Sequence, residues 1–276
     1  MMKRPVDQAY PVNESLPDKR LVGRSFSRAA PRYDQVAELQ RRVGEELLAD
    51  LLGSSLRPRT IVDVGAGTGH FAARLLERFP DARLIALDLA EGMLRQIRAR
   101  PNVKERGWLV CGDAESLPLA DRSADVVFSN LALQWCLDVS AVFAEFRRIL
   151  RPGGIVLFSS FGAETLCELR QAWRQVDGYS HVNAFCPKET VKEALIRAGF
   201  DQTTVRGSTV ALAYPNVDAL MRELKALGAH NVTVNRPRHL MGKEAMRKML
   251  AAYEDLMPDG RIRASFEFIR GYALRG

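Results

Sequence analysis

No run of eighteen apolar residues occurs in this 276-residue chain, which excludes a conventional transmembrane helix. The first twenty residues contain three prolines and several charges but no apolar stretch, so they do not resemble a secretory signal. The four cysteines are scattered and include no C-x-x-C pair. We therefore expect no disulfide framework, and we expect three of the four to be reduced thiols in the core of a cytoplasmic protein.

Histidine is equally scarce, and the four histidines are not spaced as metal ligands, so we expect no metal site. Basic residues are abundant instead and give a formal net charge of +7. They are not interleaved with clustered aromatic residues, which argues against a nucleic-acid-binding surface. Most of them should lie on solvated helix faces. A diffuse positive field of this kind would also attract a small acidic protein.

The most informative segment, residues 61–69, is an apolar run that ends in Gly65, Gly67 and Gly69. This pattern predicts a strand buried on both faces that leads into a tight loop where a ligand can approach the backbone. A dinucleotide-binding loop would need glycine at position 70, which is His70, and the lysine of a P-loop is also missing. An acidic residue followed by three alternating glycines resembles instead the first motif of class I methyltransferases, which bind S-adenosylmethionine.

Polar side chains stand at the ends of three further predicted strands. Asp88 follows the glycine loop by about twenty positions and could accept hydrogen bonds from two ribose hydroxyls. Asp113 could accept one from the amine of adenine, although either acid alone could also be a helix cap. Because ligands bind at the carboxyl ends of strands in an open α/β sheet, these positions should meet in one site. The predicted cofactor-binding residues are Asp63, Gly65, Gly67, Gly69, Asp88, Leu89, Asp113, Ala114, Asn130 and Leu131.

Strands alternate with helices through most of the chain, which predicts an α/β protein with a doubly wound, mostly parallel sheet of seven strands. Two further helices, at residues 217–227 and 243–256, interrupt the last strands. We expect them to form a helical cap over residues 215–262 that excludes water and selects the substrate.

The chain should otherwise form a single domain. We expect residues 1–24 to be a flexible leader and residues 25–276 to be the methyltransferase domain. Apolar residues at helical spacing predict that this domain begins with a helix over residues 25–52.

Several longer segments, in a fixed order, point to one methyltransferase family. They are Gln134-Trp135-Cys136, Thr165-Leu166-Cys167-Glu168-Leu169-Arg170, His181-Val182-Asn183 and Leu224-Lys225-Ala226-Leu227-Gly228-Ala229-His230. The series resembles the malonyl-acyl-carrier-protein O-methyltransferases of biotin synthesis, and the likeness extends from Asp18 to the C-terminus. The resemblance implies methyl transfer from S-adenosylmethionine to the free carboxylate of a malonyl group carried on acyl carrier protein or on CoA.

Such a reaction needs no general base, because a carboxylate with a pKa of about 4 is already ionised at neutral pH. Catalysis then depends on aligning the reacting atoms and removing water. Four side chains could orient the carboxylate by donating hydrogen bonds: Tyr33, His181, Asn183 and Lys225. Each also has a plausible structural role in a helix or loop. Where many members of the family have an arginine, this chain has Ala184, so no guanidinium can act from that position.

Three alternatives remain open from the sequence. Small-acid methyltransferases of the trans-aconitate type share a similar Asn-x-x-Leu-Gln-Trp segment. Assembly factors of respiratory complex I, among them a protein arginine hydroxylase, resemble the chain over residues 161–170. A binding scaffold without turnover would bind the cofactor and methylate no acid. The Gln134-Trp135-Cys136 segment favours the biotin enzyme over the assembly factors.

Overall fold

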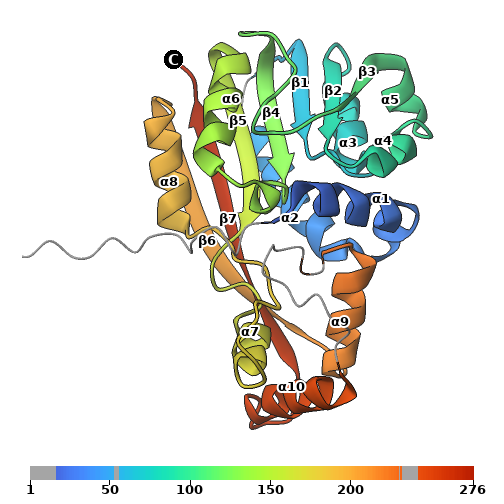
Figure 1. Cartoon of the computed structure of the whole chain (residues 1–276). Helices are drawn as coiled ribbons and strands as arrows, with labels where there is room; N and C mark the ends of the chain where they lie inside the picture. The colour runs from blue at the N-terminus through green and yellow to red at the C-terminus, as the bar shows by residue number, and fades with distance from the viewer. Residues whose placement is uncertain (1–16, 53–55, 230, 232–241) are drawn as a thin grey trace, which may run out of the picture.

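The structure, a computed structural model, describes residues 17–52, 56–229, 231 and 242–276. Its centre is a seven-stranded sheet in the order β3-β2-β1-β4-β5-β7-β6, shown in Figure 1. The first five of these strands are parallel, and β7 runs antiparallel to both β5 and β6. This arrangement confirms the predicted doubly wound sheet. The strands are β1 (Thr60–Val64), β2 (Arg83–Asp88), β3 (Gly107–Cys111), β4 (Ala124–Asn130), β5 (Leu150–Phe161), β6 (Gln202–Ala213) and β7 (Arg263–Leu274).

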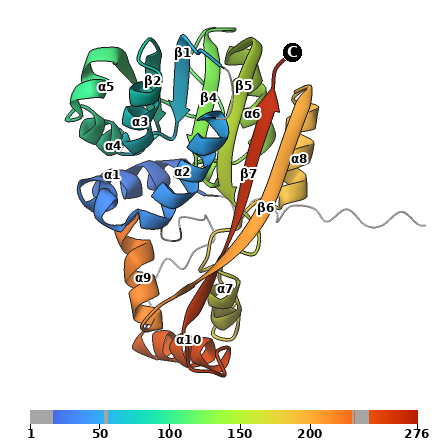
Figure 2. The same ribbon diagram turned by 180° about the vertical axis from the view of Figure 1, so that it is seen from behind.

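Helices cover both faces of the sheet (Figures 1 and 2). One face is covered by α6 and α8, and the other by α2, α3, α4 and α5. The helices are α1 (Lys19–Val36), α2 (Glu38–Leu52), α3 (His70–Arg78), α4 (Glu91–Ile97), α5 (Pro101–Arg106), α6 (Val139–Ile149), α7 (Cys167–Arg174), α8 (Lys188–Arg197), α9 (Val217–Ala226) and α10 (Lys243–Asp255), and a 3-10 turn spans Leu133–Trp135.

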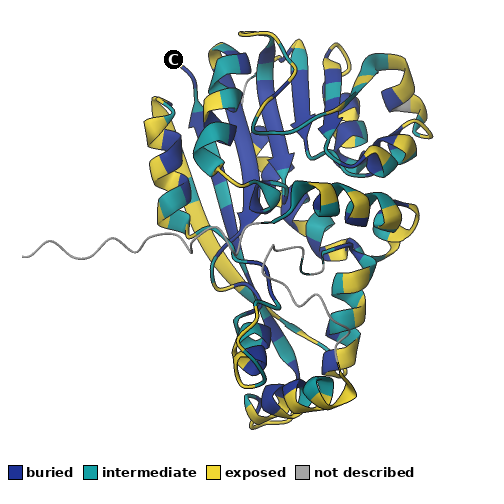
Figure 3. Cartoon of the chain, in the orientation of Figure 1, coloured by how far each residue is buried: buried dark blue, intermediate teal, exposed yellow. Residues whose placement is uncertain are grey.

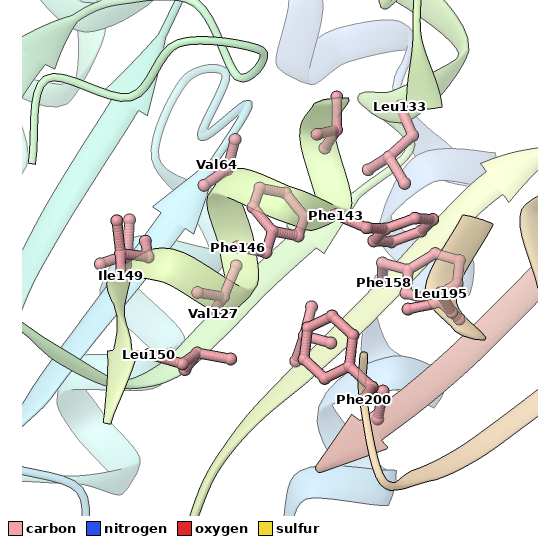
Figure 4. Packing of buried hydrophobic residues seen from close by; sticks show 14 of the residues in the cluster. Val64, Val127, Leu133, Phe143, Phe146, Ile149, Leu150, Phe158, Leu195 and Phe200 are labelled. Carbon is pink, nitrogen blue, oxygen red and sulfur yellow. The ribbon is translucent and has the colours of Figure 1, made fainter. Parts of the chain in front are cut away.

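Successive side chains of the central strands alternate between two apolar layers, as the pleat of a strand requires. Val127 and Phe158 face the layer of α6 and α8, whereas Phe128 and Leu157 face the layer of α2 and α3. The ring of Phe143 on α6 packs against Phe158 with 5.0 Å between ring centroids (Figure 4). Because both faces are buried, these strands are continuous apolar runs in the sequence.

The strands β6 and β7 continue beyond the carboxyl ends of the parallel strands (Figures 1 and 2). Their extension packs with α7, α9 and α10 around a separate apolar cluster that includes Phe266, Phe268, Leu220 and Tyr253. The helices α9 and α10 lie between β6 and β7 in the sequence, within the range 215–262 of the predicted helical cap. Residues 230 and 232–241 of that range lie outside the described residues. This lower part of the molecule therefore faces the edge of the sheet where a ligand is expected.

The first helix begins earlier than the sequence analysis predicted. Helix α1 starts at Lys19, because the Asp18 carboxylate accepts hydrogen bonds from the backbone N–H groups of Arg20 and Leu21 and so caps the helix. The predicted leader boundary at residue 24 is therefore wrong, and its residues 1–16 lie outside the described residues. The chain also leaves the helical conformation at Ala37, so the single predicted helix is two helices.

The burial predicted for the cysteines is wrong as well. Cys111 is exposed, and the other three cysteines are only partly buried. Cys136 and Cys186 pack against the edge of the main apolar cluster rather than inside it. Among the described residues, no helix combines the length and apolar character needed to cross a bilayer. The same residues contain no group of three His, Cys, Asp or Glu side chains placed to hold a metal ion.

Candidate active site

Three glycines with positive φ, Gly65, Gly67 and Gly69, shape the loop after β1. Gly65 has a φ of 74°, and a Cβ at this position would lie 2.3 Å from the Cβ of Ala132. Gly67 has a φ of 55°, and a Cβ there would meet no atom within 4 Å. The backbone of this loop thus adopts a conformation that residues with a Cβ rarely adopt. The space beside Gly67 is not filled by other atoms of the described residues. Gly69 instead caps the start of α3 and packs against Ile97.

Asp88, at the end of β2, is held beside this loop by two backbone donors. The N–H of Gly67 donates to Oδ2 at 2.8 Å, and the N–H of Ala90 donates to Oδ1 at 2.7 Å. Burial raises the pKa of Asp88 to about 6, against the lowering effect of these two hydrogen bonds. Each oxygen keeps lone-pair capacity, so the carboxylate can accept further hydrogen bonds from a ligand.

Asp63 is a buried acid with an unused oxygen. Its residue is only 2% exposed, and its Oδ2 has no hydrogen-bond partner within the described part of the chain. Burial, and secondly the charge of Asp88, raise the pKa of Asp63 to about 8. A buried acceptor without a partner costs roughly 1–3 kcal/mol. A cationic donor bound in the adjoining pocket would recover that free energy.

These residues border two adjoining hollows at the carboxyl ends of the strands, which we call the inner pocket. The hollows share Tyr33, Gly65, Gly67 and Asn130. The first is also lined by Lys19, Val22, Phe26, Asp88, Leu89, Met93, Asp113, Ala114, Leu131 and Trp135, and the second by Gln40, Arg41, Asp63, His70 and Phe71. Of the ten predicted cofactor-binding residues, all but Gly69 therefore line this pocket.

The predicted acceptor Asp113 has a partner within the chain. Lys19, near the start of α1, places its Nζ 2.5 Å from Asp113 Oδ2 and also contacts Glu115. The other oxygen, Asp113 Oδ1, accepts the backbone N–H of Glu115 at 3.0 Å. The ion pair brings the first turn of α1 over this end of the inner pocket. A ligand amine would therefore share Asp113 with Lys19.

Asn130 uses its side-chain amide to join the walls of the pocket. Its Nδ2 donates to the backbone carbonyl of Gln40 at 2.9 Å, and its Oδ1 accepts from the Ser159 hydroxyl at 2.7 Å. These bonds connect the end of β4 to α2 and β5. The side chain thus holds the segments that form the pocket walls together, and Asn130 itself lines both hollows.

A larger space, which we call the outer cavity, has a volume of about 1110 Å³ and lies among α1, α7 and α9. It meets the inner pocket at two residues: Trp135 lines both the cavity and the first hollow, and Gln40 lines both the cavity and the second. The two spaces therefore adjoin, with Trp135 and Gln40 forming their common border. Apolar side chains on its wall include Leu39, Phe161, Leu166, Leu169, Phe185 and Leu224.

Three of the four predicted donors lie in the outer cavity. The His181 ring stacks on Trp173 with 3.8 Å between ring centroids, and its Nε2 lies 2.8 Å from Asp177 Oδ1. Asn183 is buried on the same wall, and Lys225 is exposed on α9. These contacts fix the plane of the imidazole at the cavity wall.

Tyr33 lies in the inner pocket rather than in the outer cavity. Burial and the nearby charge of Asp88 raise the pKa of the Tyr33 phenol well above its usual value. The hydroxyl therefore remains protonated at neutral pH and can donate a hydrogen bond. Its place at the junction of the two hollows separates it from the other three predicted donors.

The sequence analysis missed several residues that line the inner pocket. Lys19, Val22 and Phe26 lie on α1, which was assigned partly to a leader. The spacing of Val22 and Phe26, four residues apart and following an Asp cap, is a helix signal that could have identified them. Trp135 belongs to the Gln134-Trp135-Cys136 segment quoted above, but no local pattern indicates that it and Gln40 border two adjoining spaces.

Comparisons with known proteins agree with this geometry. A methyltransferase-domain family model matches residues 62–158. The malonyl-[acyl-carrier protein] O-methyltransferase of Methylococcus capsulatus (strain Bath) is 51% identical over 92% of this chain and 92% of its own length. The biotin biosynthesis bifunctional protein BioHC of Cellvibrio japonicus is 41% identical over 95% of this chain and 51% of its own length. A Bacillus halodurans protein assigned as a methyltransferase shares the fold, with a TM-score of 0.61 and 21% identity over 84% of this chain and 99% of its own.

A parallel sheet with one antiparallel strand, a glycine loop after β1 and a pocket at the strand ends define a class I S-adenosylmethionine-dependent methyltransferase. Within that class, the identity over nearly the whole chain settles the family. The chain belongs to the malonyl-[acyl-carrier protein] O-methyltransferases.

Proposed function

We propose that this methyltransferase transfers a methyl group from S-adenosylmethionine to the free carboxylate of a malonyl thioester on acyl carrier protein, producing a methyl ester for biotin synthesis. The observation that carries the proposal is the junction of the inner pocket and the outer cavity at Trp135 and Gln40. It supports transfer between a buried donor and a thioester that enters from outside. A relative named for the same reaction supports the choice of substrate, and another named for biotin biosynthesis supports the pathway.

The residues of the inner pocket fit S-adenosylmethionine. The space above Gly67 would admit a ligand against the backbone, and the unpaired Oδ2 of Asp63 would accept a hydrogen bond from an ammonium group. Asp88 would accept hydrogen bonds from ribose hydroxyls, while Leu89 and Met93 would pack against the adenine. When bound, the cofactor supplies an activated methyl group.

The outer cavity would hold and dehydrate the acceptor. Its apolar side chains would exclude water from the carboxylate, and desolvation would raise the reactivity of an oxygen that is already ionised. Asn183 and His181 lie on that wall and would orient the malonyl group by hydrogen bonding, with Lys225 contributing from α9. The chain is thus required to align and desolvate the reactants, without a general base.

Replacing Tyr33 by phenylalanine should slow turnover about tenfold while changing cofactor affinity less than threefold. Tyr33 lines both hollows, and a single hydrogen bond from its hydroxyl would contribute roughly 0.5–1.5 kcal/mol. Single-turnover rates and calorimetric binding of S-adenosylhomocysteine would separate the two effects. Equal turnover in both proteins would return Tyr33 to a structural role.

Cofactor affinity should rise with pH between about 6 and 8. The pKa values of Asp63 and Asp88 are raised in the protein without ligand, to about 8 and about 6. Protonated carboxyls cannot pair with a cationic cofactor, so binding must release protons below these pKa values and none above them. Calorimetry in buffers with different ionisation enthalpies would count those protons. Affinity independent of pH, with no proton release at pH 7, would contradict the raised pKa of Asp63.

The acceptor can be identified by offering methyl-labelled S-adenosylmethionine with malonyl-carrier protein, malonyl-CoA, trans-aconitate and bulk tRNA in parallel. We expect rapid labelling of the malonyl thioesters. Faster labelling of trans-aconitate would favour the small-acid methyltransferase, and label on tRNA alone would overturn the proposal. Cofactor binding without any labelled product would favour the scaffold or the arginine hydroxylase.

A further inference from the structure

Four arginines of α1 recur at every fourth position: Arg20, Arg24, Arg28 and Arg32. At 3.6 residues per turn this spacing places them along one side of the helix. All four are exposed, and within the described part of the chain none forms an ion pair with a carboxylate. We call this row the arginine stripe. Like charges four residues apart destabilise a helix by roughly 0.2–0.5 kcal/mol per pair. An anionic partner would therefore offset the repulsion between neighbouring arginines of the stripe.

The stripe borders the mouth of the outer cavity. Arg24, Arg28 and Arg32 line the cavity and are nevertheless exposed, which places them at its opening. On the α9 side of the opening, Arg222 and Lys225 are also exposed and line the same cavity. A hydrogen bond links the two sides: the Ser25 hydroxyl of α1 donates to the carbonyl of Gly228, which follows α9, at 2.9 Å.

Carboxylates at this opening do not balance the cations. The acidic residues that line the cavity are Asp218 and Glu223, and Glu223 accepts a hydrogen bond from the Tyr214 hydroxyl at 3.1 Å. On α1 itself, Asp34 is paired with Arg100, and Asp18 caps the helix. The mouth therefore carries an excess of positive charge that the described residues leave uncompensated.

The same helix separates this charged surface from the inner pocket. Val22, Phe26 and Tyr33 of α1 line the inner pocket, whereas exposed positions recur along its outer side (Figure 3). Ion pairs at two points fix the helix in place, Lys19 with Asp113 near its start and Asp34 with Arg100 near its end. A partner bound to the stripe would thus sit at a fixed distance from the methyl donor.

We propose that the arginine stripe, together with Arg222, is the docking surface for an acidic helix of the carrier protein, which directs the thioester arm into the outer cavity. This inference rests on the proposed function. From Arg20 to Arg32 the stripe is about 18 Å long, which matches a partner helix of roughly three turns. Carboxylates spaced along such a helix would complement the arginines and speed encounter.

Charge reversal tests the surface. We expect Arg24→Glu combined with Arg28→Glu to lower kcat/KM for malonyl-carrier protein at least tenfold more than it lowers kcat/KM for malonyl-pantetheine. Added salt should lower kcat/KM for the carrier substrate in the parent and much less in this variant. The matched control combines Arg206→Glu with Arg247→Glu, two exposed arginines on β6 and α10, and should retain most activity with the carrier substrate.

Several results would overturn the docking surface. One is an equal loss of kcat/KM with malonyl-pantetheine, which would show that the arginines bind the malonyl-pantetheine part of the substrate or are needed for folding. Another is a matching loss on malonyl-phosphopantetheine, which would make the arginines a phosphate site. A third is the same loss of kcat/KM in the control variant, which would show that the effect arises from the change in net charge and not from the position of the arginines.

Direct binding of the carrier protein, followed by fluorescence anisotropy without turnover, separates this inference from the proposed function. If the parent methylates no malonyl thioester, the proposed function fails. The docking surface would still be supported if the parent bound the carrier and the Arg24/Arg28 reversal weakened that binding at least tenfold. Absence of carrier binding by the parent, or equal binding by both proteins, would overturn it.

Discussion

Replacing Asp88 by alanine is expected to weaken binding of S-adenosylmethionine and S-adenosylhomocysteine by about 1–3 kcal/mol, or roughly five- to 150-fold. The change removes the acceptor proposed for the ribose hydroxyls. It also leaves the N–H groups of Gly67 and Ala90 without the carboxylate that holds the loop in place. Isothermal calorimetry with both ligands measures the loss, and thermal unfolding of the ligand-free protein shows whether the fold survives.

The matched control for Asp88 is Glu91→Ala, three residues further along the chain. Glu91 is an exposed carboxylate at the start of α4 that pairs with Arg95. Its removal should change affinity less than twofold, because an exposed ion pair contributes little. Unchanged affinity in Asp88→Ala would remove Asp88 from the cofactor site, and an equal loss in both variants would point to general electrostatics instead.

Replacing Gly65 by alanine should be about as damaging. The new Cβ would lie 2.3 Å from the Cβ of Ala132, and the residue would have to keep a φ of 74°. Overpacking costs roughly 1–3 kcal/mol, and a side chain at positive φ adds strain. The loop is expected to shift away from the end of β4, with lower thermal stability and at least tenfold weaker cofactor binding.

A second substitution separates these two causes. Ala132→Gly removes the atom with which the new Cβ collides, so the double variant should recover a large part of the lost affinity but keep the cost of the backbone strain. The double-mutant cycle measures this coupling directly. Strict additivity of the two changes would show that contact between positions 65 and 132 does not shape the loop.

The sheet and the glycine loop could be predicted because their signals are local. Central strands buried on both faces appear as apolar runs, and residues at or near their carboxyl ends, such as Asp63, Asp88 and Asn130, line the inner pocket. Asp63 and Asp88 could be predicted as pocket residues from this pattern, because the carboxyl ends of parallel strands lie at the same edge of the sheet. The fold of the core is therefore largely contained in short segments of sequence.

The remaining features depend on contacts between distant segments. Lys19 and Asp113 are 94 positions apart, and no local pattern indicates that α1 folds over the strand ends to pair them. The break at Ala37 has no glycine or proline to mark it. It allows α1 to pack across α4 while Leu47 and Leu51 of α2 enter the core beside α3.

The donors illustrate the same distinction. Tyr33, His181, Asn183 and Lys225 could be selected as polar residues in suggestive segments, but not assigned to one space or the other. The structure places Tyr33 in the inner pocket and the other three in the outer cavity. That division follows from the position of α1 between the two spaces, which is a tertiary property.

The most direct test of the account is the chemical form of the transferred methyl group. Malonyl-carrier protein and acetyl-carrier protein, which lacks a free carboxylate, would be incubated with the enzyme and methyl-labelled S-adenosylmethionine. The account predicts label on the malonyl form only, released by mild alkali as methanol because it is held as an ester. Label that withstands alkali, or equal labelling of the acetyl form, would contradict methyl transfer to the malonyl carboxylate.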